Sequence, residues 1–141
     1  MSLVNDIGQY LAGQSLGLSY GASGNLFNTP FPESAPDASV CIIEYASVES
    51  IRCMGASVSA PVAEVRRFQV VVRDVLDNFA TAQSLAQSIC NLLDHLGTWT
   101  GATSGARYLN ITALQMPFYI GEDDNHRHQF SCNYEALKER G

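Results

Sequence analysis

Apolar and polar residues alternate in two segments of the chain, 64–73 and 129–136. Successive side chains of a β-strand point to opposite faces of a sheet, so this alternation predicts two half-buried strands. The polar members of each run are expected to meet water or a partner. The apolar members are expected to face the core: Phe68, Val70, Val72, Phe130, Cys132, Tyr134 and Ala136.

Four further segments are short and rich in apolar, β-branched or aromatic residues, a composition that favours strands. The clearest is 40–45 (VCIIEY), whose length suits a buried central strand. The others are 98–102, 108–116 and 118–121. Asn25-Leu26-Phe27 is predicted to be a brief strand, so most of the regular structure is extended.

Apolar residues at helical spacing predict two helices. The first covers residues 2–12. The second and stronger one covers 78–96, and its face containing Phe79, Ile89 and Leu93 is expected to pack on the sheet. Gly97 is predicted to end this helix, since glycine readily takes the left-handed conformation that follows many helices.

Two segments lack a regular pattern. Residues 28–39 contain Pro30, Pro32 and Pro36, which fix φ and remove backbone donors, so a surface connection is predicted there. Residues 46–63 are rich in Ala, Ser and Val and predict a long hairpin arm or loop.

Together these elements predict one α+β domain spanning residues 1–141. A mainly antiparallel sheet is expected to be packed by one long helix and a short N-terminal helix, with an extended hairpin arm or loop.

The charge of the chain argues against free nucleic acid as the primary ligand. Its formal net charge is −6 and it has only 8 Lys plus Arg residues to neutralise phosphates. Arg66, Arg67 and Arg73 are expected to be solvated or partner-facing rather than one basic patch. Only 16% of residues are charged, against about 25% in an average globular chain. Such a surface is easily buried in protein contacts, which indicates an assembling subunit.

Motifs for catalysis or cofactor binding are absent from the sequence. It has no C-x-x-C pair among its four cysteines, no G-x-S-x-G elbow and no phosphate-binding loop. We therefore expect no enzyme activity and no cofactor, and we expect the cysteines to be reduced structural thiols. It also lacks a signal peptide and any run of about 18 apolar residues, so a soluble cytoplasmic product without membrane contact is predicted.

One cluster resembles a metal site. Asp123 and Asp124 lie in a turn-forming stretch directly before His126 and His128, and carboxylates and imidazoles are common ligands of divalent metals. The same residue types also suit an exposed hairpin tip, and no further ligand has diagnostic spacing. We favour the exposed hairpin, with a metal site as the alternative.

Several segments, taken in order, carry a resemblance to a known family. They are LVNDIGQYL, NLF, the strand ending Glu44-Tyr45, FQVVVRD, the long helix, RYL, QMPF, and IG with an acidic turn leading to FSCNYE. In this order they resemble the siphophage minor capsid proteins and the similar phage tail terminator proteins, and the resemblance covers nearly the whole chain.

This resemblance implies a single tail-terminator-like domain and a structural role in the virion, with no catalytic residues. It implies a homo-oligomeric ring, commonly a hexamer, that caps the tail tube at the head–tail junction. The partners would be other copies of the chain, the tail tube protein and a neck or connector protein. DNA passing through the lumen would not bind specifically. The alternative is a small metal-dependent hydrolase or an accessory phage protein that uses the Asp123/Asp124/His126/His128 hairpin.

The residues predicted to contact partners come mainly from segment 46–63. Glu49 and Arg52 are the only charged residues in this segment, and this low charge suits burial against a neighbour. Trp99 is expected to fill the core, with an interface anchor as the alternative. The interface candidates are Glu49, Ile51, Arg52, Met54, Val58 and Phe31.

Overall fold

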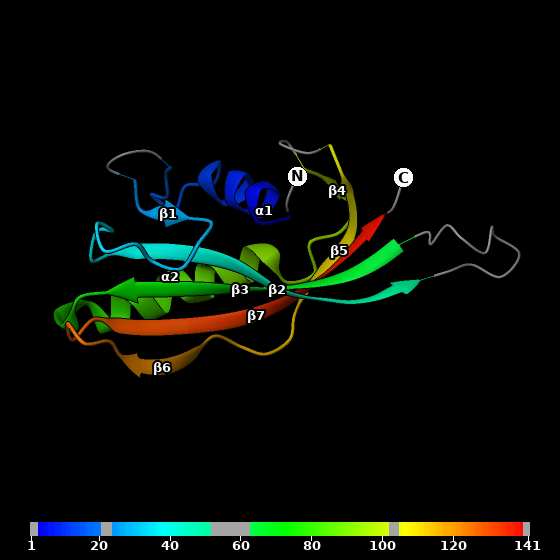
Figure 1. Cartoon of the computed structure of the whole chain (residues 1–141). Coiled ribbons are helices and arrows are strands. Elements are labelled where there is room, and N and C mark those ends of the chain that lie inside the picture. The colour runs from blue at the N-terminus through cyan, green and yellow to red at the C-terminus, as the bar shows by residue number, and fades with distance from the viewer. Residues whose placement is uncertain (1–2, 21–23, 52–62, 102–104, 140–141) are drawn as a thin grey trace, which may run out of the picture.

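The computed structural model describes residues 3–20, 24–51, 63–101 and 105–139 (Figure 1). The regular structure of these residues consists of two α-helices, one short 3-10 helix and the strands of one sheet. In chain order they are α1 (Leu3–Ala12), β1 (Leu26–Phe27), β2 (Ser39–Ile51), β3 (Ala63–Asp74), η1 (Leu76–Asn78), α2 (Phe79–Leu93), β4 (Trp99–Thr100), β5 (Arg107–Ala113), β6 (Phe118–Glu122) and β7 (His128–Glu139). The α+β prediction is confirmed.

The strands form one seven-stranded sheet in the order β1-β2-β3-β7-β5-β4, with β6 also paired to β7. Every pairing is antiparallel except that of β1 with β2. β7 pairs with β3 along one side and shares its other side between β6 and β5. Residues between Ala113 and Phe118 carry the chain from one half of β7 to the other.

The predicted register of the two alternating strands is confirmed. Phe68 lies opposite Tyr134 and Val72 opposite Phe130, and all four side chains are buried. The rings of Phe68 and Tyr134 stack with their centroids 5.2 Å apart. Ser131, predicted to meet water or a partner, is instead buried, because it lies in a row between Val71 and Phe118 and accepts a hydrogen bond from Gln69.

Residues 46–51 belong to the sheet rather than to a loop. β2 and β3 stay paired as far as Ser50 with Glu64 and Ile51 with Ala63, at the right end of the sheet in Figure 1. A hairpin arm is therefore correct for this part of segment 46–63, and its remainder lies outside the described residues.

The long helix is shorter than predicted at its carboxyl end. α2 ends at Leu93, and His95 rather than Gly97 takes the left-handed conformation, with φ 61°. The reason is tertiary. The Asp94 carboxylate accepts a hydrogen bond from the backbone N–H of Ala113 at 2.8 Å, and Leu96 forms a bridge with Ile111. These contacts with β5 replace the last predicted helical turn.

The helical faces predicted to pack are largely correct. Ile89 and Leu93 are fully buried against the sheet. Phe79 at the first turn of α2 is 39% exposed, although its ring contacts Phe130 with centroids 5.0 Å apart. It lies at the margin of the core, where the β6–β7 hairpin covers only one side of it.

The first helix is held by a buried acid. Asp6 is fully buried within α1 and accepts a 2.7 Å hydrogen bond from the hydroxyl of Tyr108 on β5. Trp99 contacts the rings of Tyr10 and Tyr108, at 5.5 and 4.9 Å between centroids, and packs against the core while partly buried, so the core-filling prediction holds in part. A side chain at Gly101 would collide with the Asp6 carboxylate, so α1, β4 and β5 meet closely here.

The described cysteines are buried and free: Cys41, Cys90 and Cys132. Burial raises the pKa of the Cys41 and Cys132 thiols to about 11, which keeps them protonated at neutral pH. Cys53 lies outside the described residues. Within those residues, no helix is both long and apolar enough to cross a membrane.

Candidate assembly surface

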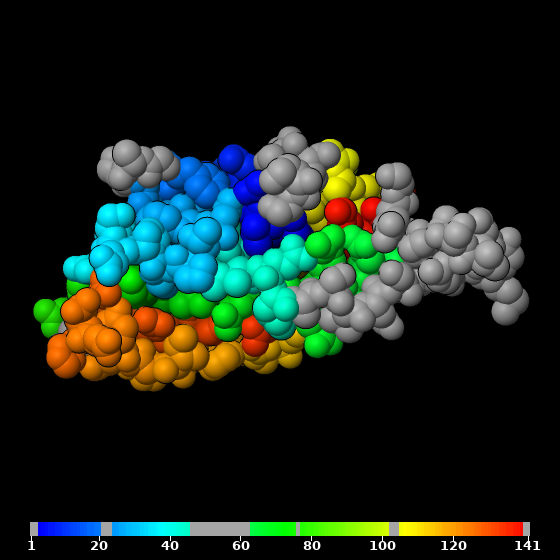
Figure 2. Space-filling model, viewed as in Figure 1, coloured from blue at the N-terminus to red at the C-terminus, as the bar shows by residue number. Residues whose placement is uncertain are grey.

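The two faces of the sheet differ in what covers them. α2 packs on the face carrying Phe68 and Tyr134 and lies behind the sheet in Figure 1. No described helix covers the face turned toward the viewer, which Figure 2 shows in the same orientation. Its centre is polar: Gln69 donates to Ser131 at 2.8 Å, and Arg67 pairs with Glu135 at 3.2 Å. We call this surface the open face.

An apolar stripe borders the open face along β6 and the segment before it. It consists of Leu114, Met116, Phe118 and Ile120, which are 43%, 63%, 40% and 47% exposed. Phe118 lies opposite the buried Ser131, and the backbone N–H of Leu114 bonds to the carbonyl oxygen of Asn133. The stripe therefore runs beside β7, at the lower margin of the molecule in Figure 2.

The composition of this edge is unusual. Natural sheets generally protect an edge strand with charges, a proline or a bulge. Here Pro117 precedes β6 and a register shift separates Tyr119 from Gly121, yet residues 113–121 include no charged side chain. The backbone of β6 is thus protected from indiscriminate pairing, while its side chains present an uncharged surface that suits contact with another protein.

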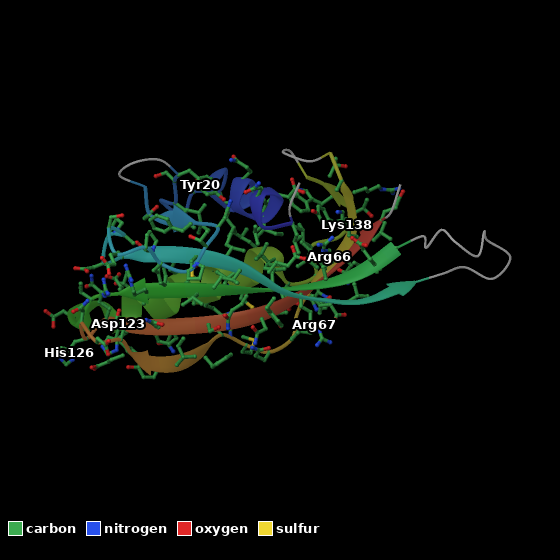
Figure 3. The ribbon with its side chains drawn as sticks, in the orientation of Figure 1. Tyr20, Arg66, Arg67, Asp123, His126 and Lys138 are labelled. Carbon is green, nitrogen blue, oxygen red and sulfur yellow. The ribbon has the colours of Figure 1, made fainter. Side chains whose placement is uncertain are left out.

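Charges at the base of the β2–β3 arm neutralise one another. Arg66 binds Glu44 at 2.6 Å and Glu64 at 2.7 Å, and Lys138 lies 3.9 Å from Glu64. Figure 3 shows Arg66 and Lys138 close to each other on neighbouring strands. Burial lowers the pKa of Arg66, but the two carboxylates outweigh this effect and raise it above its ordinary value.

The predicted interface candidates fall into three groups. Phe31 is already engaged within the chain, since it contacts Phe27 at 6.5 Å between centroids and lies beneath the guanidinium of Arg73. Glu49 and Ile51 lie in β2, where the structure describes the backbone alone. The others lie outside the described residues: Arg52, Met54 and Val58. Their contacts with partners remain predictions.

The candidate metal ligands of the β6–β7 hairpin make separate contacts within the chain. His126 lies in the turn with φ 59° and its Nδ1 is 3.1 Å from Glu122, whereas His128 is buried and its Nδ1 lies 2.9 Å from the Tyr119 hydroxyl. The two rings do not share one side of a strand, as the metal alternative required. No group of three His, Cys, Asp or Glu side chains among the described residues is arranged to hold a metal ion.

The predicted hairpin tip is exposed at Asp124, Asn125 and His126, whereas Asp123 is partly buried and organises the turn. One carboxylate oxygen accepts hydrogen bonds from the backbone N–H groups of Asn125 and Arg127, and the other binds the Arg127 guanidinium at 2.7 Å. Partial burial raises the pKa of Asp123, but these hydrogen bonds and the guanidinium charge bring it below its ordinary value. Figure 3 shows Asp123 on the inner side of the turn and His126 at its outer end.

Asp123→Ala is expected to lower the free energy of unfolding by about 1–2 kcal/mol, because it removes an acceptor of two backbone N–H groups and an ion pair. The neighbouring Asp124→Ala, at an exposed position, should change it by less than about 0.5 kcal/mol. Because the folded-state pKa of Asp123 is lowered, its contribution is present above the unfolded-state pKa and disappears as pH falls through the folded-state value. Urea denaturation of both variants at neutral and acidic pH measures this difference, and equal effects at the two positions would contradict it.

Comparison with known proteins identifies the family of this chain. The sequence model described as "Bacteriophage tail terminator protein" matches residues 3–140. The chain belongs to the bacteriophage tail terminator family. The family is structural rather than enzymatic, so this terminator is a structural protein of a phage tail. No curated protein matches the sequence at a significant level.

A solved structure supports the fold of this terminator. A chain from the "Virion of native gene transfer agent (GTA) particle" superposes with a TM-score of 0.69 at 15% identity. The alignment covers 99% of this chain and 96% of the other. At that identity the likeness establishes the shared fold.

Basic side chains of the terminator are occupied by its own acids and carbonyl groups. Arg67 pairs with Glu135, Arg107 with Glu139, and Arg66 and Lys138 with the acids at the base of the arm. Arg127 binds both Asp123 and Asp37. Within the described residues, each Lys or Arg therefore has an acidic or carbonyl partner, which leaves little positive potential to hold phosphates.

Arg73, predicted to be solvated or partner-facing, is buried. Its guanidinium donates to the carbonyl oxygens of Pro36 at 2.7 Å and Asp37 at 3.2 Å, and lies 4.1 Å from the centroid of the Phe31 ring. Burial and the like charge of Arg127 lower the pKa of Arg73. The residue fastens segment 28–38 over the end of the sheet instead of meeting a partner.

The sequence interpretation of this terminator missed the apolar stripe. The sequence predicts strands at 108–116 and 118–121 but does not place their apolar side chains on a surface. A usable signal was present, since Leu114, Met116, Phe118 and Ile120 recur every second residue in a stretch without charge. The same alternation describes a core strand, so only the structure shows that these side chains face outward.

Proposed function

We propose that this protein forms a closed ring, most simply a hexamer, that ends the tail tube at the head–tail junction. In this role one copy contacts its neighbours in the ring, the last ring of the tail tube protein on one side and a neck or connector protein on the other. Membership of the tail terminator family supports this proposal, and the virion source of the structural neighbour agrees with it.

The observation that carries the ring is an open sheet with two unlike edges. On one side β1 covers β2 only at Val40 and Cys41, so the rest of the outer edge of β2 has no described strand partner. On the other side, the outer edge of β6 has no described partner either. Unlike surfaces on opposite sides of one molecule give head-to-tail contacts, and such contacts close into a ring when the rotation between copies divides a full turn.

The β2–β3 arm is the second proposed contact. Its segment 46–63 has few charges, so burial against a neighbour or the tail tube carries a small desolvation penalty. The candidates on it are Glu49, Ile51, Arg52, Met54 and Val58. DNA that passes through the ring would not adhere to it, because the net charge is −6 and the described cations have partners within the chain.

Replacing residues 50–60 by a short Gly-Ser turn tests the arm. The fold should persist, because residues 39–44 of β2 remain, as do the residues of β3 and β7 that lie beside them in the sheet. Ring formation or tail joining should be lost, since the arm is proposed to contribute a second contact, either to the next copy or to the tail tube. Light scattering on the purified protein and electron microscopy of complemented particles provide the measurements.

A Gly-Ser replacement of the exposed turn 124–125 serves as the control for loop substitution and should leave rings and tails intact. Infectious particles with tails of correct length from the arm variant would contradict the proposal. So would a native complex found only as a two-fold dimer.

A further inference from the structure

We propose that the apolar stripe of one copy binds the Tyr45 side of β2 on the next copy, so that these two patches form the ring contact. The inference rests on the proposed ring and assigns its two complementary surfaces to named residues. The stripe is Leu114, Met116, Phe118 and Ile120.

The distribution of exposed apolar side chains leads to this assignment. Beyond the stripe, the large apolar side chains exposed among the described residues are Tyr45, Phe79 and Tyr119. Phe79 and Tyr119 contact each other, with ring centroids 5.3 Å apart, and both also contact Phe130. Tyr45 remains, half exposed, on a strand far from the stripe in the sheet order.

The positions of the two patches match a head-to-tail contact. Tyr45 lies on β2, at a register shift between Glu44 and Ala46 and on the part of the strand that β1 does not cover. The stripe is separated from β2 by β3 and β7 and lies on the opposite edge of the sheet. Because the patches differ and lie on opposite sides, each copy offers one to each neighbour, as a heterologous ring requires.

The charges of the chain favour a second copy of it as the partner of both patches. A chain of net charge −6 repels its own copies, so self-association needs surfaces without uncompensated charge. The stripe has none, and the carboxylate beside Tyr45, that of Glu44, is neutralised by Arg66 at 2.6 Å. A basic partner would instead be attracted to exposed acids such as Asp124. The two uncharged patches therefore suit contact between two acidic molecules, with Tyr45 as an aromatic anchor against the stripe.

The first test places a negative charge in each patch of the full chain. Met116→Glu and Tyr45→Glu should each weaken subunit association by about tenfold or more, as expected when a central interface residue is lost. Gln83→Glu, which adds the same charge at an exposed position of α2, should have no effect. Sedimentation velocity over a concentration series measures association, and circular dichroism checks that each variant is folded. Unchanged association in both patch variants would overturn the inference.

A mixing experiment shows whether the two patches bind each other. Met116→Glu retains the Tyr45 patch and Tyr45→Glu retains the stripe. Mixed together, the two variants should form two-chain complexes through their intact patches but no rings, whereas each variant alone should stay monomeric. Native mass spectrometry distinguishes these species. If the mixture associates no better than the separate variants, the two patches do not bind each other and the inference fails.

Binding to tails, measured separately by electron microscopy, distinguishes this inference from the proposed function. Met116→Glu rings that form normally but no longer bind tails would overturn the inference and assign the stripe to the tube protein, while the proposed function would stand. Wild-type rings that require both patches but never bind tails would leave the inference standing and remove the proposed function. Wild-type protein that stays monomeric, alone and on tails, would overturn both.

Discussion

Phe68→Ala is expected to lower the free energy of unfolding by about 3–5 kcal/mol, the range for removing a large aromatic side chain from a packed core. Phe68 is fully buried at the middle of β3 and stacks on Tyr134 of β7. Its removal leaves a cavity between the two strands at the centre of the sheet. For a domain with about 5–15 kcal/mol of total stability, this loss is a large fraction. Urea denaturation followed by circular dichroism provides the measurement.

The matched control is Phe118→Ala on the edge strand β6. Phe118 is 40% exposed in the monomer, so the same truncation there should cost less than about 1.5 kcal/mol. Measurements on dilute protein keep subunit contacts from contributing to the result. Similar losses at both positions would show that β3 and β7 do not form the centre of the core.

Arg73→Ala is expected to destabilise the fold by about 2–4 kcal/mol, because it removes a buried guanidinium together with its hydrogen bonds to carbonyl groups of segment 28–38. The guanidinium reaches Ala35, Pro36 and Asp37 from β3 and lies over Phe31. Arg73→Lys should recover only part of the loss, since one ammonium group cannot reproduce a planar fork of donors. Thermal unfolding measures all three proteins.

Arg107→Ala provides the comparison at the surface. Arg107 is 55% exposed and pairs with Glu139, so its replacement should cost between about 0 and 1 kcal/mol. If Arg73→Ala had an equally small effect, segment 28–38 would have to be held in place by contacts other than this guanidinium.

The sheet and its register were predictable from the sequence because burial on one face imposes a period of two on strand residues. Phe68, Val70 and Val72 lie in the core as the alternation predicted. The end of α2 was not predictable in the same way. Gly97 carries a local stop signal, but Asp94 is drawn away from the helix by the backbone N–H of Ala113, a contact between residues distant in sequence.

The candidate surface was predictable only in part. The family resemblance correctly indicated a structural protein of a phage tail. Low charge led to the prediction of contacts in segment 46–63, and the exposed stripe on β6 was not predicted. The sequence predicts a surface position for Arg73, because a cation on the polar side of a strand usually meets water. The carbonyl groups that surround it come from a proline-containing segment whose path the local sequence does not determine.

The central position of β7 affects when the protein becomes able to assemble. β7 joins β3, β5 and β6, and it follows all three in the chain, so a ribosome delivers it after its partners. Its pairing with β3 joins residues far apart in sequence, a topology that folds slowly because a long loop must close first. Without β7, β6 has no described strand to pair with and the stripe has no fixed position. In the ring proposed above, a nascent chain could therefore join only after synthesis has passed β7, which would keep incomplete subunits out of the assembly.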